Sequence, residues 1–205
     1  MALVNAYATE QEFRDHIGDQ GGTLNLTMIE RALNTASRMI DQYTGRRFWQ
    51  DLTTANKRFW PDNQLLLYVD DISTDFTEVR TDEDDDGTYE LLWDVADVLR
   101  EPVNSGIDIG TSFAKWRILA VGTKRFPVAR LRPPVQVTAQ WGWATTPPEI
   151  TEATVLKAAK LFNLKNAPLG IAGFGDFGAL RISRQDPEVI ELIQPYVRIG
   201  MNGIA

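Results

Sequence analysis

The sequence predicts an α+β fold in which a helical bundle of about four helices is interrupted by an inserted small antiparallel β-sandwich or barrel. Amphipathic segments with helix-capping signals lie at both ends of the 205-residue chain, and short β-type runs separated by turn residues fill its middle. All six tryptophans fall in that middle part. We therefore expect a helical domain of residues 1–47 and 144–205, and a β-module of residues 48–143.

Two helices are expected before the β-module. The segment TEQEFRDHIGD opens on the Thr-x-x-Glu spacing of a capping box and is followed by a glycine-rich turn. The segment TMIERALNTASRMIDQYTG repeats these signals, with Thr27 at the expected cap. Its apolar residues recur in steps of four and three, which places them on one stripe: Ile29, Leu33, Ala36, Ile40 and Tyr43.

The β-module is predicted from seven short runs: KRFW, LLLYV, FTEVRT, TYELLW, KWRILAV, VARLR and VQVTAQWGW. Turn signals such as PDN, DDDG, VGT and RPP separate them. In VQVTAQW, apolar and polar residues alternate, which is typical of a strand with one buried face. The sequence therefore predicts several short antiparallel strands rather than further helices.

Two more helices are expected after the β-module. The first follows the prolines of TTPPEI and ends before Pro168. A glycine-rich loop and the short strand ALRIS come next. The last helix is DPEVIELIQPY, with Asp186 as its N-cap and Pro187 in its first turn. Its apolar stripe is Val189, Ile190, Ile193 and Tyr196.

The composition excludes enzyme classes that depend on cysteine or on several histidines. The chain has no cysteine, so thiol nucleophiles and cysteine-ligated metals are excluded, and its only histidine is His16. We interpret His16 as a polar residue on a surface helix. Paired acids between Asp70 and Glu101 leave a carboxylate-based hydrolase as a weak alternative. We expect no catalytic residue, cofactor or metal site, and no membrane-spanning or secretory segment.

The stretch GFGDFG, residues 173–178, matches the dinucleotide-binding pattern G-x-G-x-x-G. That pattern needs a strand before it and a helix after it, so that a helix N-terminus meets the pyrophosphate. Here a helix precedes the glycines and ALRIS follows them, so we reject nucleotide binding. The loop carries apolar side chains among its glycines, and these need a cover within the chain or on a partner.

The stretch DEDDDG, residues 82–87, begins like an EF-hand calcium loop, but Trp93 stands where the bidentate glutamate should be. Its flanks also read as strands. We therefore favour an acidic turn between two strands. A weak calcium site remains the second interpretation.

The net charge of −7 is unevenly spread along the chain. Residues 70–101 hold thirteen acidic and two basic residues, whereas residues 115–132 hold six basic residues and no acidic one. The arginines of the basic run are expected to pair with the acidic stretch, in the same chain or in a neighbour. For the neighbour case we name an inter-subunit set: Asp84, Asp85, Asp86, Lys124, Arg125, Arg130 and Arg132.

Four segments together resemble the head–tail connector (adaptor, or head-completion) proteins of tailed bacteriophages. They are ALNTASRMIDQYTGRRFW, VQVTAQWGWATTPPEI, the acidic Asp-Gly turn, and the stretch from ATVLKAAKLFNLKN through PLGIAGFGDFGALRIS to DPEVIELIQPY. The last is the most specific, because its helix, proline, Gly-Phe-Gly loop, strand and Asp-Pro helix follow one another in family order. The segments span most of the chain.

The resemblance implies a structural virion protein of the phage neck and not an enzyme. Such proteins form a ring, commonly about twelve-fold, beneath the portal and extend the DNA channel toward a stopper or tail-completion protein. DNA would pass without sequence-specific binding, and an acidic chain suits that role. The protein would be found in the virion neck, and in the host cytoplasm during assembly.

The resemblance also implies that the C-terminal part engages the portal. The residues expected to contact the portal or a neighbouring subunit are Leu169, Ile171, Phe174, Phe177, Arg181 and Tyr196. We expect the two phenylalanines to be buried only after assembly. The rival function, from a different class, is a carbohydrate- or calcium-binding β-module carried on a helical base.

Overall fold

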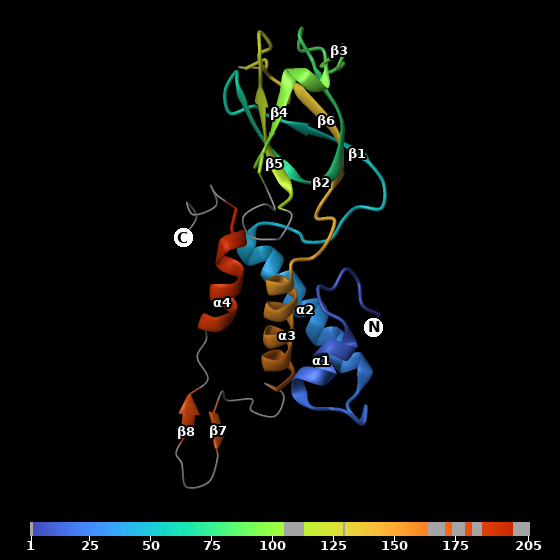
Figure 1. Cartoon of the computed structure of the whole chain (residues 1–205), viewed down its shortest axis with the longest axis vertical. Coiled ribbons are helices and arrows are strands. Elements are labelled where there is room, and N and C mark those ends of the chain that lie inside the picture. The colour runs from blue at the N-terminus through green and yellow to red at the C-terminus, as the bar shows by residue number, and fades with distance from the viewer. Residues whose placement is uncertain are drawn as a thin grey trace. The chain divides into compact units, whose positions relative to one another are not determined.

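The computed structural model describes residues 2–104, 113–128, 130–163, 171–173, 179–181 and 186–198. The chain divides into two compact units, one of Met1–Phe48 with Thr146–Ala205 and one of Trp49–Thr145. We call them the helical unit and the β-module. The described residues form four α-helices and an antiparallel sheet, which confirms the α+β fold class (Figure 1).

The two N-terminal helices are α1 (Glu10–Ile17) and α2 (Leu26–Thr44). The capping box of α1 is confirmed, because Thr9 and Glu12 each accept from the other's backbone N–H. The cap predicted for α2 is wrong: Asn25, two residues before Thr27, accepts from the Met28 N–H. An amide side chain caps as well as a hydroxyl, so the sequence offered two neighbouring caps.

The C-terminal helices are α3 (Pro148–Asn163) and α4 (Pro187–Ile193), and the short 3₁₀ turn η3 (Gln194–Tyr196) follows α4. Between α3 and α4, the backbone of β7 (Ile171–Gly173) pairs antiparallel with that of β8 (Ala179–Arg181). The strand predicted in ALRIS is therefore confirmed, and a partner strand precedes it. None of the helices in the described ranges is long and apolar enough to cross a membrane.

The core of the helical unit lies where α2 packs on α3, with α1 and α4 against α3. The buried apolar residues of one core cluster are Ala8, Phe13, Ile29, Ala32, Leu33, Ala36, Val155, Ala158 and Ala159. Small alanines on both facing helices allow a close approach of the two backbones. The predicted stripe of α2 is confirmed for its first four members, but Tyr43 is 47% exposed.

The β-module is one antiparallel sheet in the order β1-β6-β2-β5-β4, with the short β3 paired to β2. The strands are β1 (Ala55–Phe59), β2 (Leu66–Thr81), β3 (Leu91–Leu92), β4 (Val98–Glu101), β5 (Lys115–Ala120) and β6 (Val135–Trp141). A 3₁₀ turn, η1 (Val95–Asp97), precedes β4. The first half of β2 pairs with β5 and the second half with β6, so the sheet curls around one core (Figure 1).

Alternation along β6 places its four odd-numbered residues in the core, as the sequence predicted. Its last residue, Trp141, is fully buried, and its indole N–H donates to the Ala55 carbonyl at 2.7 Å. The next residue must be glycine. Gly142 has φ +103°, and a Cβ there would lie 1.9 Å from the Trp49 carbonyl oxygen.

Three strand predictions are wrong in detail. LLLYV and FTEVRT belong to the single strand β2, because irregular register near Ile72 lets one strand bend and change partner. The described residues of VARLR form no strand, and β4 was not predicted. Arg130, Leu131 and Arg132 are instead bound to the acidic turn through hydrogen bonds that sequence patterns do not reveal.

Candidate interaction surfaces

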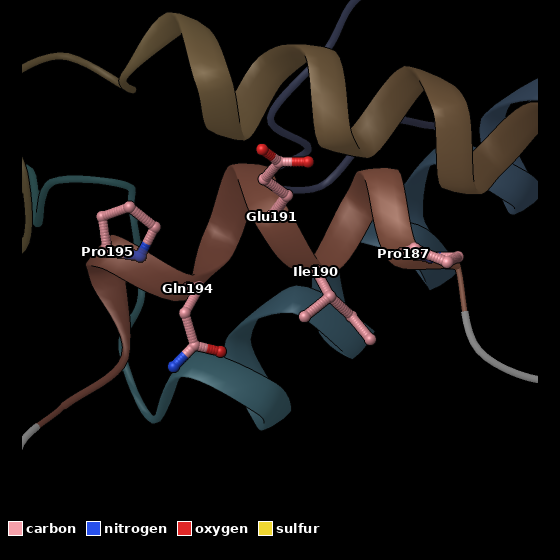
Figure 2. A pocket seen from close by; sticks show the side chains of 5 residues that line it. All are labelled: Pro187, Ile190, Glu191, Gln194 and Pro195. Atoms are coloured by element: carbon pink, nitrogen blue, oxygen red, sulfur yellow. The ribbon is translucent and has the colours of Figure 1, made fainter.

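An apolar hollow lies along α4 and the turn that follows it (Figure 2). Its lining is Pro187, Ile190, Glu191, Gln194 and Pro195. In the close-up, the Ile190 and Gln194 side chains project from one side of the helix and the Glu191 carboxylate from the other. Pro187 and Pro195 stand near the two ends of the helical segment, and each restricts the backbone φ angle at its position. The lining offers the Glu191 carboxylate, the Gln194 carboxamide and otherwise apolar carbon to a partner.

A second groove of about 270 Å³ runs between α2 and α4 and shares Ile190 with the first hollow. Met39 and Tyr43 of α2 line it at 40% and 47% exposure. The sequence did not predict this surface, because Tyr43 and Ile190 belong to the apolar stripes that were expected to face the core. No sequence signal marks them as exposed, since the groove depends on how α2 and α4 lie beside each other.

One end of the groove is fixed by Asp186, the N-cap residue of α4. Its position was predicted correctly, but its carboxylate caps no backbone N–H and instead pairs with Lys157, at 2.8 Å, and Lys160 of α3. Burial raises the pKa of the Asp186 carboxyl. The hydrogen bonds and charges of the two lysines lower this pKa by more, so the net effect is a pKa below the ordinary value. The pairing ties the start of α4 to α3.

Tyr196 lies inside the helical unit at 4% exposure. Its ring packs edge-on against Phe48, with centroids 5.7 Å apart, and its hydroxyl donates to Glu149 at 2.9 Å. Burial, and then the Glu149 carboxylate, raises the pKa of this phenol. The Arg46 side chain donates to the Tyr196 carbonyl at 2.8 Å. Tyr196 therefore packs within its own chain, and its contact with a partner stays a prediction.

The glycine-rich stretch is only partly described. The backbones of Ile171 and Arg181, two of the predicted interface residues, are directly paired across β7 and β8. Leu169, Phe174 and Phe177 lie outside the described residues, so their role stays a prediction. Because a strand, β8, follows the glycines, the structure supplies no helix N-terminus for a phosphate at this motif.

The DEDDDG stretch is a turn built around the buried carboxylate of Asp82. Its two oxygens accept from the backbone N–H groups of Asp85, at 2.7 Å, and Gly87, at 2.8 Å. Burial raises the pKa of the Asp82 carboxyl, but these backbone hydrogen bonds lower it below its ordinary value. Asp85 and Gly87 adopt left-handed φ angles of 67° and 93°. The favoured interpretation, an acidic turn, accounts for all of these contacts.

Four carboxylates lie close together at this turn. One oxygen from each of Asp82, Asp84, Asp86 and Glu90 lies within 4.8 Å of the others. Hard cations such as Ca²⁺ prefer such oxygen ligands. Both Asp82 oxygens also accept from backbone N–H groups, so hydrogen bonds within the turn stabilise its shape.

The basic residues of the predicted inter-subunit set have partners in the same chain. Arg130 donates to the Glu83 carbonyl at 2.6 Å, and Arg132 donates to that of Asp86. Lys124 lies 3.9 Å from Asp97, and Arg125 donates to the Gly122 carbonyl at 3.0 Å. Asp85 accepts from the Leu131 backbone N–H at 3.0 Å. The structure thus shows pairing within the chain, and pairing between subunits stays a prediction.

No protein-family model matches this sequence. No curated protein matches it either. Solved structures do match over nearly the whole chain. A chain from the neck of an empty GTA particle, computed with C6 symmetry, is 18% identical, with a TM-score of 0.56 over 96% of this chain and 92% of that chain. One from the neck of a native GTA particle, computed with C12 symmetry, is 19% identical, with a TM-score of 0.54 over 96% and 91%.

A third match comes from the virion of a native gene transfer agent (GTA) particle, at 19% identity and a TM-score of 0.54 over 96% of this chain and 92% of that chain. The matches cover both units, so the helical unit and the β-module occur together in those chains. The predicted resemblance to head–tail connectors is therefore confirmed at the level of the fold. This chain has the fold of a protein found in the neck of a gene transfer agent particle.

Proposed function

We propose that this protein is a structural component of the neck of a phage-like particle. It forms a ring adaptor between the portal and the next head–tail joining component, and it extends the DNA channel. The observation that supports the proposal is the shared fold with neck chains over 96% of its length. The C6 and C12 symmetries of those necks favour a ring, with twelve copies as the expected number.

The surfaces described above suit assembly better than catalysis. A ring needs two different complementary faces on each subunit, and the helical unit offers the α2–α4 groove and the α4 hollow as one such face. The chain's charge of −7 disfavours tight binding of DNA phosphates, as a conduit requires. The predicted portal contacts around the glycine-rich stretch belong to this proposal.

Purified particles test the proposal directly. We expect mass spectrometry to find the chain in intact particles, and a symmetric reconstruction of the neck to place a ring of it next to the portal. Negative-stain images of the purified protein mixed with portal should show the same ring. Particles that assemble and transfer DNA normally without this chain would overturn the proposal.

A double substitution tests the predicted portal contact. Replacing Phe174 and Phe177 with serine should leave the unfolding temperature unchanged but block incorporation into particles. Phe13→Ser, which alters a fully buried core residue, is the contrasting control, since it should lower the unfolding temperature. Normal incorporation of the double variant would remove these phenylalanines from the proposed interface.

A further inference from the structure

One end of the β-module concentrates exposed apolar side chains. We call it the loop end and define it by three connections: 60–65 between β1 and β2, 82–97 between β2 and β4, and the described part of 121–134 between β5 and β6. Among the described residues of the module, seven of the eleven exposed large apolar side chains lie here: Trp60, Leu65, Leu91, Leu92, Val95, Val128 and Leu131. Exposed leucines are ordinary singly, but this gathering at one end is not.

The three connections are bound to one another. The Phe126 N–H donates to the Gln64 carbonyl at 2.8 Å, joining the first and third connections. The Trp93 ring stacks on Phe126 with centroids 4.8 Å apart, joining the second and third. Figure 1 shows the turn beside β3 and the connection from β5 to β6 at the same end of the module. A surface held in this way loses little conformational entropy when it binds.

Leu131 is the most prominent residue of the loop end, at 90% exposure. Its backbone N–H is held by the Asp85 carboxylate at 3.0 Å, and the arginines on both sides of it are bound to carbonyls of the acidic turn. The apolar side chain is therefore displayed on a fixed backbone. An exposed apolar side chain on a fixed backbone can enter a pocket on a partner with little loss of conformational entropy.

The loop end is also acidic. Glu83, Asp84, Asp86, Glu90 and Asp94 are exposed, whereas the guanidinium groups of Arg130 and Arg132 already donate to carbonyls. Fixed carboxylates repel phosphates, so a nucleic acid does not fit this surface. A partner with apolar pockets and a rim of lysines or arginines does.

The net charge of both units disfavours a second copy of the chain as the source of such a rim. The module has ten basic and sixteen acidic residues, a net charge of −6, and the helical unit has eleven and twelve, a net charge of −1. Neither unit is positive overall. We propose that the loop end of the β-module docks a different protein, one that presents apolar pockets with a basic rim to Leu131 and its neighbours. This inference rests on the proposed function, since the partner is expected in the same particle.

Site-specific photocrosslinking in producing cells tests the inference. A benzophenone amino acid replaces Leu131 in the full-length chain, and in a matched control it replaces Leu52, which is 98% exposed. Leu52 follows Asp51, whose N–H is bound to the carbonyl of Trp141, so it lies at the opposite end of β6. Intact particles are irradiated and the adducts are identified by mass spectrometry. Position 131 should give an adduct with one other particle protein at about ten times the yield at position 52.

A charge variant tests the basic rim. Asp84→Lys combined with Asp86→Lys should lower the adduct yield at position 131 several-fold, whereas Glu152→Lys, an exposed carboxylate change on α3, should not. Equal yields at 131 and 52, adducts only with DNA or a second copy, or insensitivity to the charge variant would overturn the inference while the neck role stands. Absence of the chain from purified particles would overturn the neck role and the inference together.

Discussion

The core of the helical unit is formed by two separate segments of the chain, whereas the core of the β-module is formed by one continuous segment. In the helical unit, Phe48 at the end of the first segment packs on Tyr196 near the end of the second. The Arg198 N–H donates to the Thr44 carbonyl at 2.9 Å, across the same two segments. In the β-module, all strands come from the continuous segment Trp49–Thr145. The helical unit is therefore completed only when the chain returns from the module.

This difference assigns separate tasks to the two units. A core formed from distant segments holds the ends of the inserted module at a fixed spacing, which suits a scaffold. A module with its own core tolerates changes in its connections, and its loop end carries most of its exposed apolar residues. The comparison predicts that the units respond differently to cutting the chain, to core truncation, to acid and to calcium.

Cutting the chain should have the largest effect. A fragment of residues 49–145 should fold alone and unfold cooperatively, because its apolar core needs no residue from outside the segment. A fragment of residues 1–48 should lack fixed tertiary structure, because α2 loses the faces of α3 that cover Leu33 and Ala36. Near-ultraviolet circular dichroism and thermal scans distinguish the two. A cooperative transition in fragment 1–48 would show that the first helical segment folds without the second.

Core truncation at the junction of the two helical segments should have the next largest effect. Phe48 is fully buried, and its ring lies edge-on to Tyr7 at 5.6 Å as well as to Tyr196. Phe48→Ala should reduce the free energy of unfolding by about 3–5 kcal/mol through lost contacts and a cavity. Tyr43→Ala, near the end of α2 and half-exposed, should cost about 1 kcal/mol or less. If denaturant titrations gave similar losses of unfolding free energy for the two variants, the junction at Phe48 would not be a main source of stability.

The ion pair at the start of α4 should have a smaller, pH-dependent effect. The lysines outweigh burial and hold the folded-state pKa of Asp186 below its ordinary 3.8. The stabilisation is therefore complete above the unfolded-state pKa and is lost as the pH falls through the folded-state value. Asp186→Asn, which keeps a good N-cap residue, should cost roughly 1–2 kcal/mol at neutral pH after allowance for solvent screening.

Urea titrations at several pH values measure this difference. It should shrink as the pH falls below the unfolded-state pKa and disappear once the pH lies below the folded-state pKa of Asp186, where wild type and variant meet. Glu188→Gln, an exposed change in the first turn of the same helix, is the control and should show no comparable pH dependence. A cost for Asp186→Asn that is the same at all pH values would mean that the charge of the carboxylate is not what stabilises α4.

The sequence predicted the parts of this structure that depend on local signals. Glycine after α1 and α2, proline at the start of α3 and α4, and alternation in β6 each act within a few residues. Contacts between distant residues were not predictable. Nothing near Tyr43 shows that α4 leaves it half-exposed, and nothing near Leu131 shows that Asp85 binds its N–H. The candidate surfaces depend on such contacts, so only the structure reveals them.

Calcium should have the smallest effect, and it tests whether the acidic turn of the β-module is a structural turn or an ion site. Backbone N–H groups already bind both oxygens of Asp82, and the left-handed Asp85 and Gly87 shape the turn without a cation. The bidentate glutamate of a calcium loop is also missing, because Trp93 stands at its position. Adding about 1 mM Ca²⁺, or removing it with a chelator, should therefore shift the unfolding temperature by less than about 1 °C, since a ligand far below its dissociation constant adds no stability. A saturable rise that Asp84→Asn with Asp86→Asn abolishes would identify a calcium site, and the turn would then stabilise the loop end only when the ion is bound.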